Sequence, residues 1–116
     1  MKRYSIVGQK NFGFTDSYMP GVTPGTPVTL VREPTNGYDP NAVQVWIYGK
    51  MVGYIPKTTN APLARFIDCT GKSWADTCAE HGIAFDANGP TGAQRTIKAT
   101  FVRSTNSAYP QVEVDQ

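Results

Sequence analysis

The residues best suited to binding chemistry lie in a short turn-like stretch, NGYDPN, at positions 36 to 41. Asn-Gly and Asp-Pro pairs favour turns, but a turn needs no aromatic ring held between them. The ring of Tyr38 can stack on a flat ligand or roof the core, and the Asp39 carboxylate can accept a hydrogen bond from a hydroxyl. Asp39 is also a natural Asx-type capping residue ahead of Pro40. The pattern alone therefore leaves two interpretations open, a binding turn and a purely structural one.

The remaining polar residues offer little to catalysis. The sequence has no phosphate-binding GxxxxGK[ST] loop and no Cys/His dyad at an evident spacing. Aspartates that can hold paired divalent ions are scattered, at Asp16, Asp39, Asp68 and Asp76. We therefore predict a binding protein that is not an enzyme and has no cofactor. The alternative, a metal-dependent nuclease assembled from distant positions, is open to a cleavage assay with divalent ions.

Cysteine and histidine are too few for a zinc site. The chain has Cys69, Cys78 and the single histidine His81, whereas tetrahedral zinc needs four ligands in close pairs. We expect no metal and two free thiols, as in a reducing compartment. A disulfide across this short loop is the alternative, if the two side chains face each other. His81, near an expected helix end, is interpreted as a favourable charge placement.

Length and composition favour one domain. A chain of 116 residues can bury one core, and 40% hydrophobic content with 11 Gly and 9 Pro is typical of a turn-rich, mainly β protein. The formal charge of +2 is low for a protein that coats nucleic acid, so any nucleic-acid site is expected to be small and local. No run of about 18 apolar residues occurs, and the start MKRYSIVG lacks signal-peptide features. These features predict a cytoplasmic protein without a membrane partner.

Alternating and β-branched segments predict a mostly antiparallel set of strands. Residues 42–48 alternate most clearly, with Val and Ile on one face and Trp46, interpreted as packing, on the other. The Gly49-Lys50 link favours a type II′ hairpin from this segment to residues 51–55. The expected strands are residues 2–8, 27–33, 42–48, 51–55, 83–85, 95–102 and 109–114, with a long Gly- and Pro-rich loop over 9–26.

A helix is expected soon after the hairpin. Thr59 or Asn60 can cap it, and Pro62 suits its first turn because the missing N–H is unpaired there in any helix. One apolar stripe then faces the sheet, formed by Leu63, Phe66 and Ile67.

A second short helix is predicted over residues 74–81. Ser73 and Asp76 have capping-box-like spacing, and Gly82 is a good helix stop. The alternative is a strand over the WADTC segment. Earlier in the chain, Arg32 and Glu33 are interpreted as a surface or cross-strand pair.

The central part of the chain resembles a known family. The pattern LVREP, NGYDPNAVQV and VGYIP, at residues 30–34, 36–45 and 52–56, resembles the HIRAN domain; it follows a Val7-Gly8 opening and precedes an apolar helix. The resemblance is strongest over residues 4–68 and implies one domain over 1–116. HIRAN domains are modified OB-type antiparallel β barrels, found in helicase-like fork-remodelling proteins and as short bacterial or phage proteins. The expected fold is therefore mainly β with one or two short helices.

The resemblance also implies a function, capture of the free 3′-OH end of single-stranded DNA in repair or replication. In the family, a loop aromatic stacks on the terminal base and the Tyr-Asp pair of the turn grips the last nucleotide. A further polar ring contacts the DNA backbone and a basic residue contacts phosphate. Carried over to this sequence, the expected DNA-binding residues are Lys10, Phe12, Phe14, Asn36, Tyr38, Asp39, Tyr54, Lys57 and Phe85.

Two departures from the family pattern affect this expectation. Asn11 stands where members often have a second aromatic, and Gly37 replaces the usual proline before Tyr38, which loosens the turn. The departure at Asn11 favours the alternative function. In that alternative the chain is a protein-interaction module, such as a phage or mobile-element inhibitor of a host nuclease or defence factor.

Overall fold

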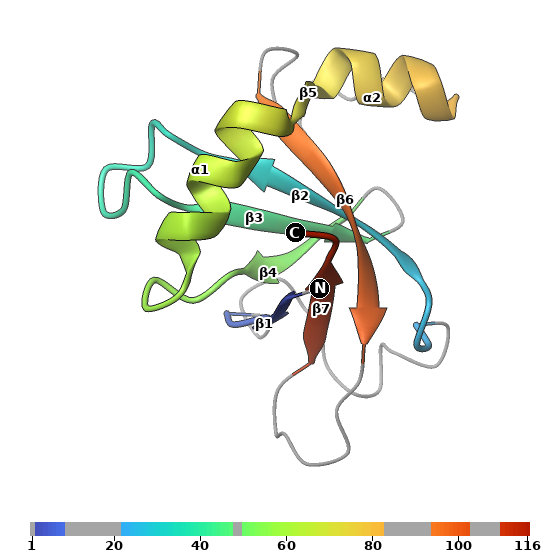
Figure 1. Cartoon of the computed structure of the whole chain (residues 1–116), viewed down its shortest axis with the longest axis horizontal. Helices are drawn as coiled ribbons and strands as arrows, with labels where there is room; N and C mark the ends of the chain where they lie inside the picture. Colours follow the sequence, from blue (N-terminus) through green and yellow to red (C-terminus); the bar gives the residue numbers. More distant parts are fainter. Residues whose placement is uncertain (1, 9–21, 48–49, 83–93, 103–109) are drawn as a thin grey trace.

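The structure is a computed structural model that describes residues 2–8, 22–47, 50–82, 94–102 and 110–116. Its elements form a mainly β fold with two short helices, as Figure 1 shows. In chain order they are β1 (Lys2–Ser5), β2 (Pro27–Arg32), β3 (Val43–Ile47), β4 (Lys50–Tyr54), α1 (Asn60–Thr70), β5 (Lys72–Ser73), α2 (Trp74–His81), β6 (Arg95–Val102) and β7 (Gln111–Val114).

The strands form one antiparallel sheet that curls until its two ends meet. Their order is β1-β7-β6-β2-β3-β4, with β5 beside β6. Just after β1, the backbones of Val7 and Tyr54 exchange two hydrogen bonds, at 2.8 and 2.9 Å between nitrogen and oxygen. This bridge joins the first strand's continuation to the end of β4, the last strand of the order. The predicted mainly β fold is confirmed, and the curled half-barrel is consistent with the expected OB-type barrel.

The concave side of the sheet holds the main core. As predicted, the alternating Val43, Val45 and Ile47 of β3 are buried in it. Helix α1 packs against β6 and β2, and its Leu63 and Ile67 are fully buried, so the predicted apolar stripe is confirmed. Phe66, the third member of that stripe, is partly buried against the same core.

The opposite side of the sheet carries a second, smaller apolar cluster near α2. Val31, Trp74 and Cys78 are buried there, and Trp46 packs against them with its ring centroid 5.9 Å from that of Trp74. The interpretation of Trp46 as a packing residue is therefore confirmed. Cys78 is buried, which raises the pKa of its thiol, whereas Cys69 is exposed. Both thiols are free, as expected, and the alternative disulfide is excluded.

The predicted α2 is confirmed together with both of its end signals. The Ser73 side chain accepts a hydrogen bond from the backbone N–H of Asp76 at 3.2 Å, and Gly82 ends the helix in the left-handed conformation with φ of 64°. The alternative strand over WADTC is therefore wrong. Neither described helix is long and apolar enough to cross a membrane.

Several predicted boundaries differ from the structure. β1 ends at Ser5; Ile6 still donates to the carbonyl of Pro110 next to β7, and the chain then changes neighbours, because Val7 pairs with Tyr54 of β4. The hairpin of β3 and β4 is antiparallel as predicted, but Lys50 pairs with Ile47 inside the ladder. Its two-residue link is thus residues 48–49, which lie outside the described part of the chain.

The short strand β5 was not predicted, and β2, β3 and β7 are each shorter than expected. β5 forms because Lys72 pairs with Thr96 of β6, a contact between distant parts of the chain that no local pattern signals. The strand predicted at residues 83–85 lies outside the described residues.

Candidate functional site

The loop between β2 and β3, residues 33–42, is closed at its base by backbone hydrogen bonds. The N–H of Glu33 donates to the carbonyl of Ala42 at 2.9 Å, and the N–H of Ala42 donates to that of Asp39 at 3.1 Å. A third bond, from the N–H of Asn36 to the carbonyl of Glu33 at 3.2 Å, makes a turn inside the loop. The loop is therefore a built turn that fixes the path of the NGYDPN stretch.

Asn36 holds the tip of this loop. Its side-chain oxygen accepts from the backbone N–H groups of Tyr38, at 2.9 Å, and Asp39, at 3.1 Å. Asp39 makes the same kind of side-chain to backbone hydrogen bond further along the loop, because its Oδ1 accepts from the N–H of Asn41 at 3.0 Å. These are the local side-chain to backbone bonds that make Asn and Asp turn formers. The structural interpretation of Asp39 as an Asx-type cap is confirmed.

Tyr38 does not roof the core. The residue is 94% exposed, and it is the large hydrophobic residue left exposed within the described part of the chain. A ring held in water at the tip of a hydrogen-bonded turn offers both faces to a ligand. The interpretation of Tyr38 as a core lid is therefore wrong, and its ring is free to act as a stacking surface.

Asp39 has a second partner from a distant part of the chain. The side-chain amide of Asn60, at the start of α1, donates to Asp39 Oδ2 at 2.7 Å, and Asn60 itself is buried. This hydrogen bond is the largest cause that lowers the pKa of Asp39, with smaller contributions from the Asn41 N–H and from the charges of Lys57 and Arg32. Asp39 is therefore held as a carboxylate at neutral pH.

The sequence predicts for Asn60 only the role of a candidate helix cap. The cap position of α1 is Thr59, whose side chain makes no capping hydrogen bond, and Asn60 turns to the loop instead. Because Asp39 and Asn60 are far apart in sequence, no local spacing could have indicated this contact.

Tyr54 lies at the end of β4, beside the same loop. Its hydroxyl hydrogen-bonds to the Glu33 carboxylate, and burial together with this bond and the negative charge of Glu33 raises the pKa of Tyr54 to about 12. Glu33 also accepts from the side-chain amide of Asn36 at 3.3 Å. Glu33 thus links Tyr54 to the residue that holds the loop tip. The Tyr54 hydroxyl stays neutral at physiological pH, with its proton directed to Glu33.

Arg32 is buried, contrary to its interpretation as a surface residue paired with Glu33. The residue is 5% exposed, and its charge partner is Asp68 of α1, with Nε to Oδ1 at 2.9 Å and Nη2 to Oδ2 at 3.3 Å. The reason lies in strand alternation. Arg32 follows Val28 and Leu30 at every second position of β2, so its side chain is on the core side next to α1.

The structure thus brings together five of the predicted binding residues at one end of the sheet, namely Asn36, Tyr38, Asp39, Tyr54 and Lys57. Lys57 is exposed in the segment before α1 and attracts the Asp39 carboxylate. The other four, Lys10, Phe12, Phe14 and Phe85, lie outside the described residues. Sequence reasoning missed Asn60, and it misassigned Arg32 and Glu33.

This arrangement combines an exposed aromatic face, a carboxylate that accepts hydrogen bonds, and a lysine. Stacking, hydroxyl recognition and phosphate attraction are the interactions that these three groups supply. Among the described residues, no group of three or more His, Cys, Asp or Glu side chains is arranged to hold a metal ion.

Comparison with family models identifies the fold family. The model of the HIRAN domain matches residues 7–104, most of the chain. The chain belongs to the HIRAN domain family. Comparison with curated proteins and with solved structures gave no match. HIRAN domains are generally DNA-binding modules, so DNA is the class of partner that membership of this family suggests for the chain.

Proposed function

We propose that this HIRAN domain captures the free 3′-OH end of single-stranded DNA, with Tyr38 stacking on a terminal base and Asp39 accepting the hydroxyl. The observation that carries the proposal is the pairing of these two neighbours. One presents an almost fully exposed ring, and the other is a carboxylate fixed by hydrogen bonds.

The exposed ring supplies affinity without base readout. A base stacked on an aromatic side chain contributes about 1–3 kcal/mol and any base can stack, because every base has a π face. Tyr38 is held by its backbone, since its own N–H donates to Asn36. The ring can therefore meet a base without the loop having to order first, which lowers the entropic cost of binding.

The Asp39 carboxylate supplies the preference for an end. Its two oxygens each accept one internal bond, from Asn60 and Asn41, and a carboxylate has about four acceptor positions. The remaining positions can accept a 3′-OH, and a hydrogen bond to a charged group contributes about 1.5–3 kcal/mol. A strand that continues, or that ends in phosphate, brings negative charge against this carboxylate and is disfavoured.

Lys57 and Tyr54 complete the proposed site with different roles. Lys57 is exposed and near enough to Asp39 to influence its pKa, so it can meet the phosphate of the terminal nucleotide. The Tyr54 hydroxyl is engaged by Glu33, so we assign Tyr54 a contact through its ring and through its oxygen as an acceptor. The proposal places Lys10, Phe12, Phe14 and Phe85 in the same site on the family resemblance alone.

The proposed activity is binding without chemistry, carried out wherever single-stranded 3′ ends arise in the cell, as in repair and replication. A HIRAN domain is a binding domain, which supports this proposal. Neither the family match nor the described geometry supports the alternative of a protein-interaction module.

The test is fluorescence anisotropy with a short strand labelled at its 5′ end and ending in 3′-OH, 3′-deoxy or 3′-phosphate. We expect the wild type to bind the 3′-OH strand about 10- to 100-fold more tightly than the 3′-deoxy strand, and the 3′-phosphate strand most weakly. Asp39→Ala should remove the preference for 3′-OH over 3′-deoxy.

The matched control is Asp76→Ala, which removes one exposed carboxylate on α2 and changes net charge equally. It should bind as the wild type does. Equal binding of all three strands by the wild type would refute end capture.

A further inference from the structure

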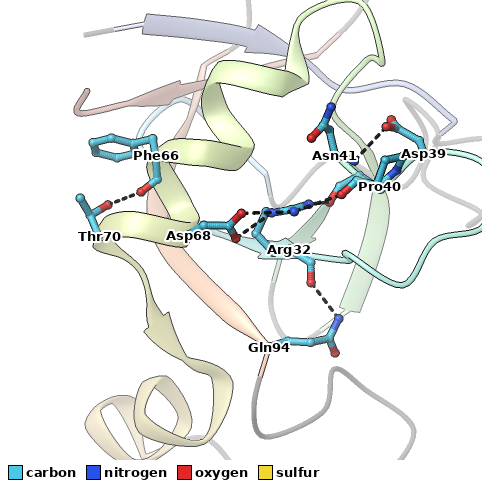
Figure 2. A network of polar contacts seen from close by, with 9 residues as sticks. Arg32, Asp39, Pro40, Asn41, Phe66, Asp68, Thr70 and Gln94 are labelled. Carbon is cyan, nitrogen blue, oxygen red and sulfur yellow. Dashed lines mark hydrogen bonds and ion pairs between the residues drawn. The ribbon is translucent and has the colours of Figure 1, made fainter.

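Arg32 is a buried charge whose guanidinium bonds to α1 and to the loop of the candidate site. Besides Asp68, its guanidinium donates through Nη1 to the carbonyl of Ala42 at 2.9 Å and through Nη2 to the carbonyl of Pro40 at 3.0 Å. Figure 2 shows this fork between α1 on one side and the loop on the other. One side chain thus ties together β2, α1 and the loop that carries Asp39.

The two carbonyls that Arg32 holds lie just after Asp39 in the chain. Pro40 is its direct neighbour, and Ala42 also closes the loop through its N–H bond to the Asp39 carbonyl. Fixing both carbonyls fixes the backbone from which the Asp39 side chain projects. A planar guanidinium can do this with parallel N–H groups, whereas the single ammonium of lysine has no such fork.

Helix α1 holds the same carboxylate from the other side. Asn60 and Asp68 lie about two turns apart on α1. Asn60 bonds directly to Asp39 Oδ2, whereas Asp68 bonds to the guanidinium of Arg32. Helix α1 therefore holds the Asp39 side chain directly through Asn60, and it holds the backbone after Asp39 indirectly through Asp68 and Arg32.

The backbone of Arg32 is fixed as well. Its carbonyl accepts from the side-chain amide of Gln94 at 2.9 Å, and the carbonyl of Gln94 accepts from the N–H of Trp74 at 2.7 Å. The end of β2 is thus anchored on the α2 side by its main chain and on the α1 side by its guanidinium.

We propose that Arg32 is a positioning residue, which holds the Asp39 carboxylate where it meets the 3′-OH by fixing the Pro40 and Ala42 carbonyls to α1. This inference rests on the proposed function and adds to it a residue that does not touch DNA. Burying a guanidinium beside a half-exposed carboxylate is costly, and an apolar residue here would leave both carbonyls without this donor.

The first test is Arg32→Lys, which keeps the positive charge and loses the fork. We expect the preference for 3′-OH over 3′-deoxy to fall to within about threefold of the Asp39→Ala value. Binding of the 3′-deoxy strand should stay within about twofold of wild type, since the Tyr38 ring is unchanged. The matched control is Arg65→Lys, the same substitution at an exposed position of α1, which should keep the wild-type preference.

The second test needs no DNA. Carbon-detected NMR titration of Asp39 reports the hydrogen bonds that lower its pKa, chiefly that from Asn60, with Lys57 and Arg32 as the facing charges. Because Arg32→Lys retains the charge, a rise of this pKa toward the ordinary aspartate value reports displaced hydrogen bonds. Loss of global stability alone would not move the pKa in the folded variant.

The outcomes separate the inference from the function on which it rests. If Arg32→Lys folds and keeps both the wild-type preference and the wild-type pKa of Asp39, the positioning role is overturned. If the wild type shows no 3′-OH preference, the proposed function fails. The titration still tests whether Arg32 maintains the hydrogen bonds that lower the pKa of Asp39. If Arg32→Lys does not fold, Asp68→Ala replaces it, because Asp68 is half-exposed and anchors the same guanidinium. An unchanged preference in Asp68→Ala would then overturn the proposal.

Discussion

At the residue scale, Tyr38 and Asp39 are neighbours with opposite ties to the rest of the molecule. The Tyr38 ring is in water, whereas both Asp39 oxygens accept hydrogen bonds, Oδ1 from Asn41 in the same turn and Oδ2 from Asn60 of α1. Substitutions of these two residues should therefore have different effects. Substitution of Tyr38 should change the affinity for DNA alone, whereas substitution of Asp39 should change both the preference for a 3′-OH end and the stability of the fold.

We expect Tyr38→Ala to weaken binding of a single strand by about 5- to 150-fold, the contribution of one stacked base. The affinities for the 3′-OH and 3′-deoxy strands should fall by the same factor, because the Asp39 carboxylate is unchanged in this variant. The midpoint of thermal unfolding should hardly change, since an exposed ring buries little on folding. Tyr38→Phe keeps the ring face and should restore most of the affinity. A loss confined to the 3′-OH strand would contradict this assignment.

The residues of the candidate site show which of its features can be predicted from the sequence alone. The Tyr38-Asp39 turn was found because Asn-Gly and Asp-Pro are local signals, and its Asx bonds span only two or three residues. Arg32 was misassigned because charged residues are rarely buried, and only strand alternation pointed inward. Its partner Asp68 comes from another element, and no local pattern encodes that pairing.

At the element scale, the two helices begin differently although both have a hydroxyl residue at the cap. Ser73 accepts the N–H of Asp76, whereas Thr59 has no side-chain capping bond and donates to the carbonyl of Pro56 at 3.4 Å. The Ser73 cap was predictable because its partner is three residues away. Asn60, the other candidate cap of α1, is instead engaged with Asp39 by a tertiary contact.

This difference gives a matched pair of variants. Ser73→Ala should lower the free energy of unfolding by about 1 kcal/mol, the usual contribution of a cap, and leave the 3′-OH preference intact. Thr59→Ala should cost less than about 0.5 kcal/mol, because no capping bond is lost. Urea unfolding followed by circular dichroism measures both. Equal losses in the two variants would show that the Ser73 bond does not cap α2 in solution.

At the scale of the whole molecule, closure of the sheet places the candidate site. The Val7–Tyr54 bridge brings the start of the chain to the end of β4, next to Glu33 and the loop. The sequence predicts most of the strands but not this bridge, because no local pattern around Val7 indicates that it pairs with Tyr54. The family resemblance predicts a barrel, and the structure shows which contact joins the two ends of the sheet.

Folding of the whole chain should also depend on the proton of Asp39. Its native pKa lies below the ordinary aspartate value of 3.8, so the unfolded chain binds protons more readily in the acid range. The contribution of Asp39 to stability is therefore fully present above about pH 5 and is lost as pH falls through 3.8 and then through the lower native pKa. Stability from this group rises with pH and then levels off.

Asp39→Asn tests this sign, because the amide oxygen can still accept from Asn41 but does not titrate. We expect the free energy of unfolding of wild type minus that of Asp39→Asn to be larger at pH 7 than at pH 3. Other carboxylates titrate in both proteins and cancel in this difference. Urea unfolding at both pH values gives the four free energies. A difference that stays constant, or grows as pH falls, would mean that the pKa of Asp39 is not lowered in the folded protein, and it would contradict the hydrogen bond from Asn60 and the nearby charges of Lys57 and Arg32 as the groups that hold this carboxylate.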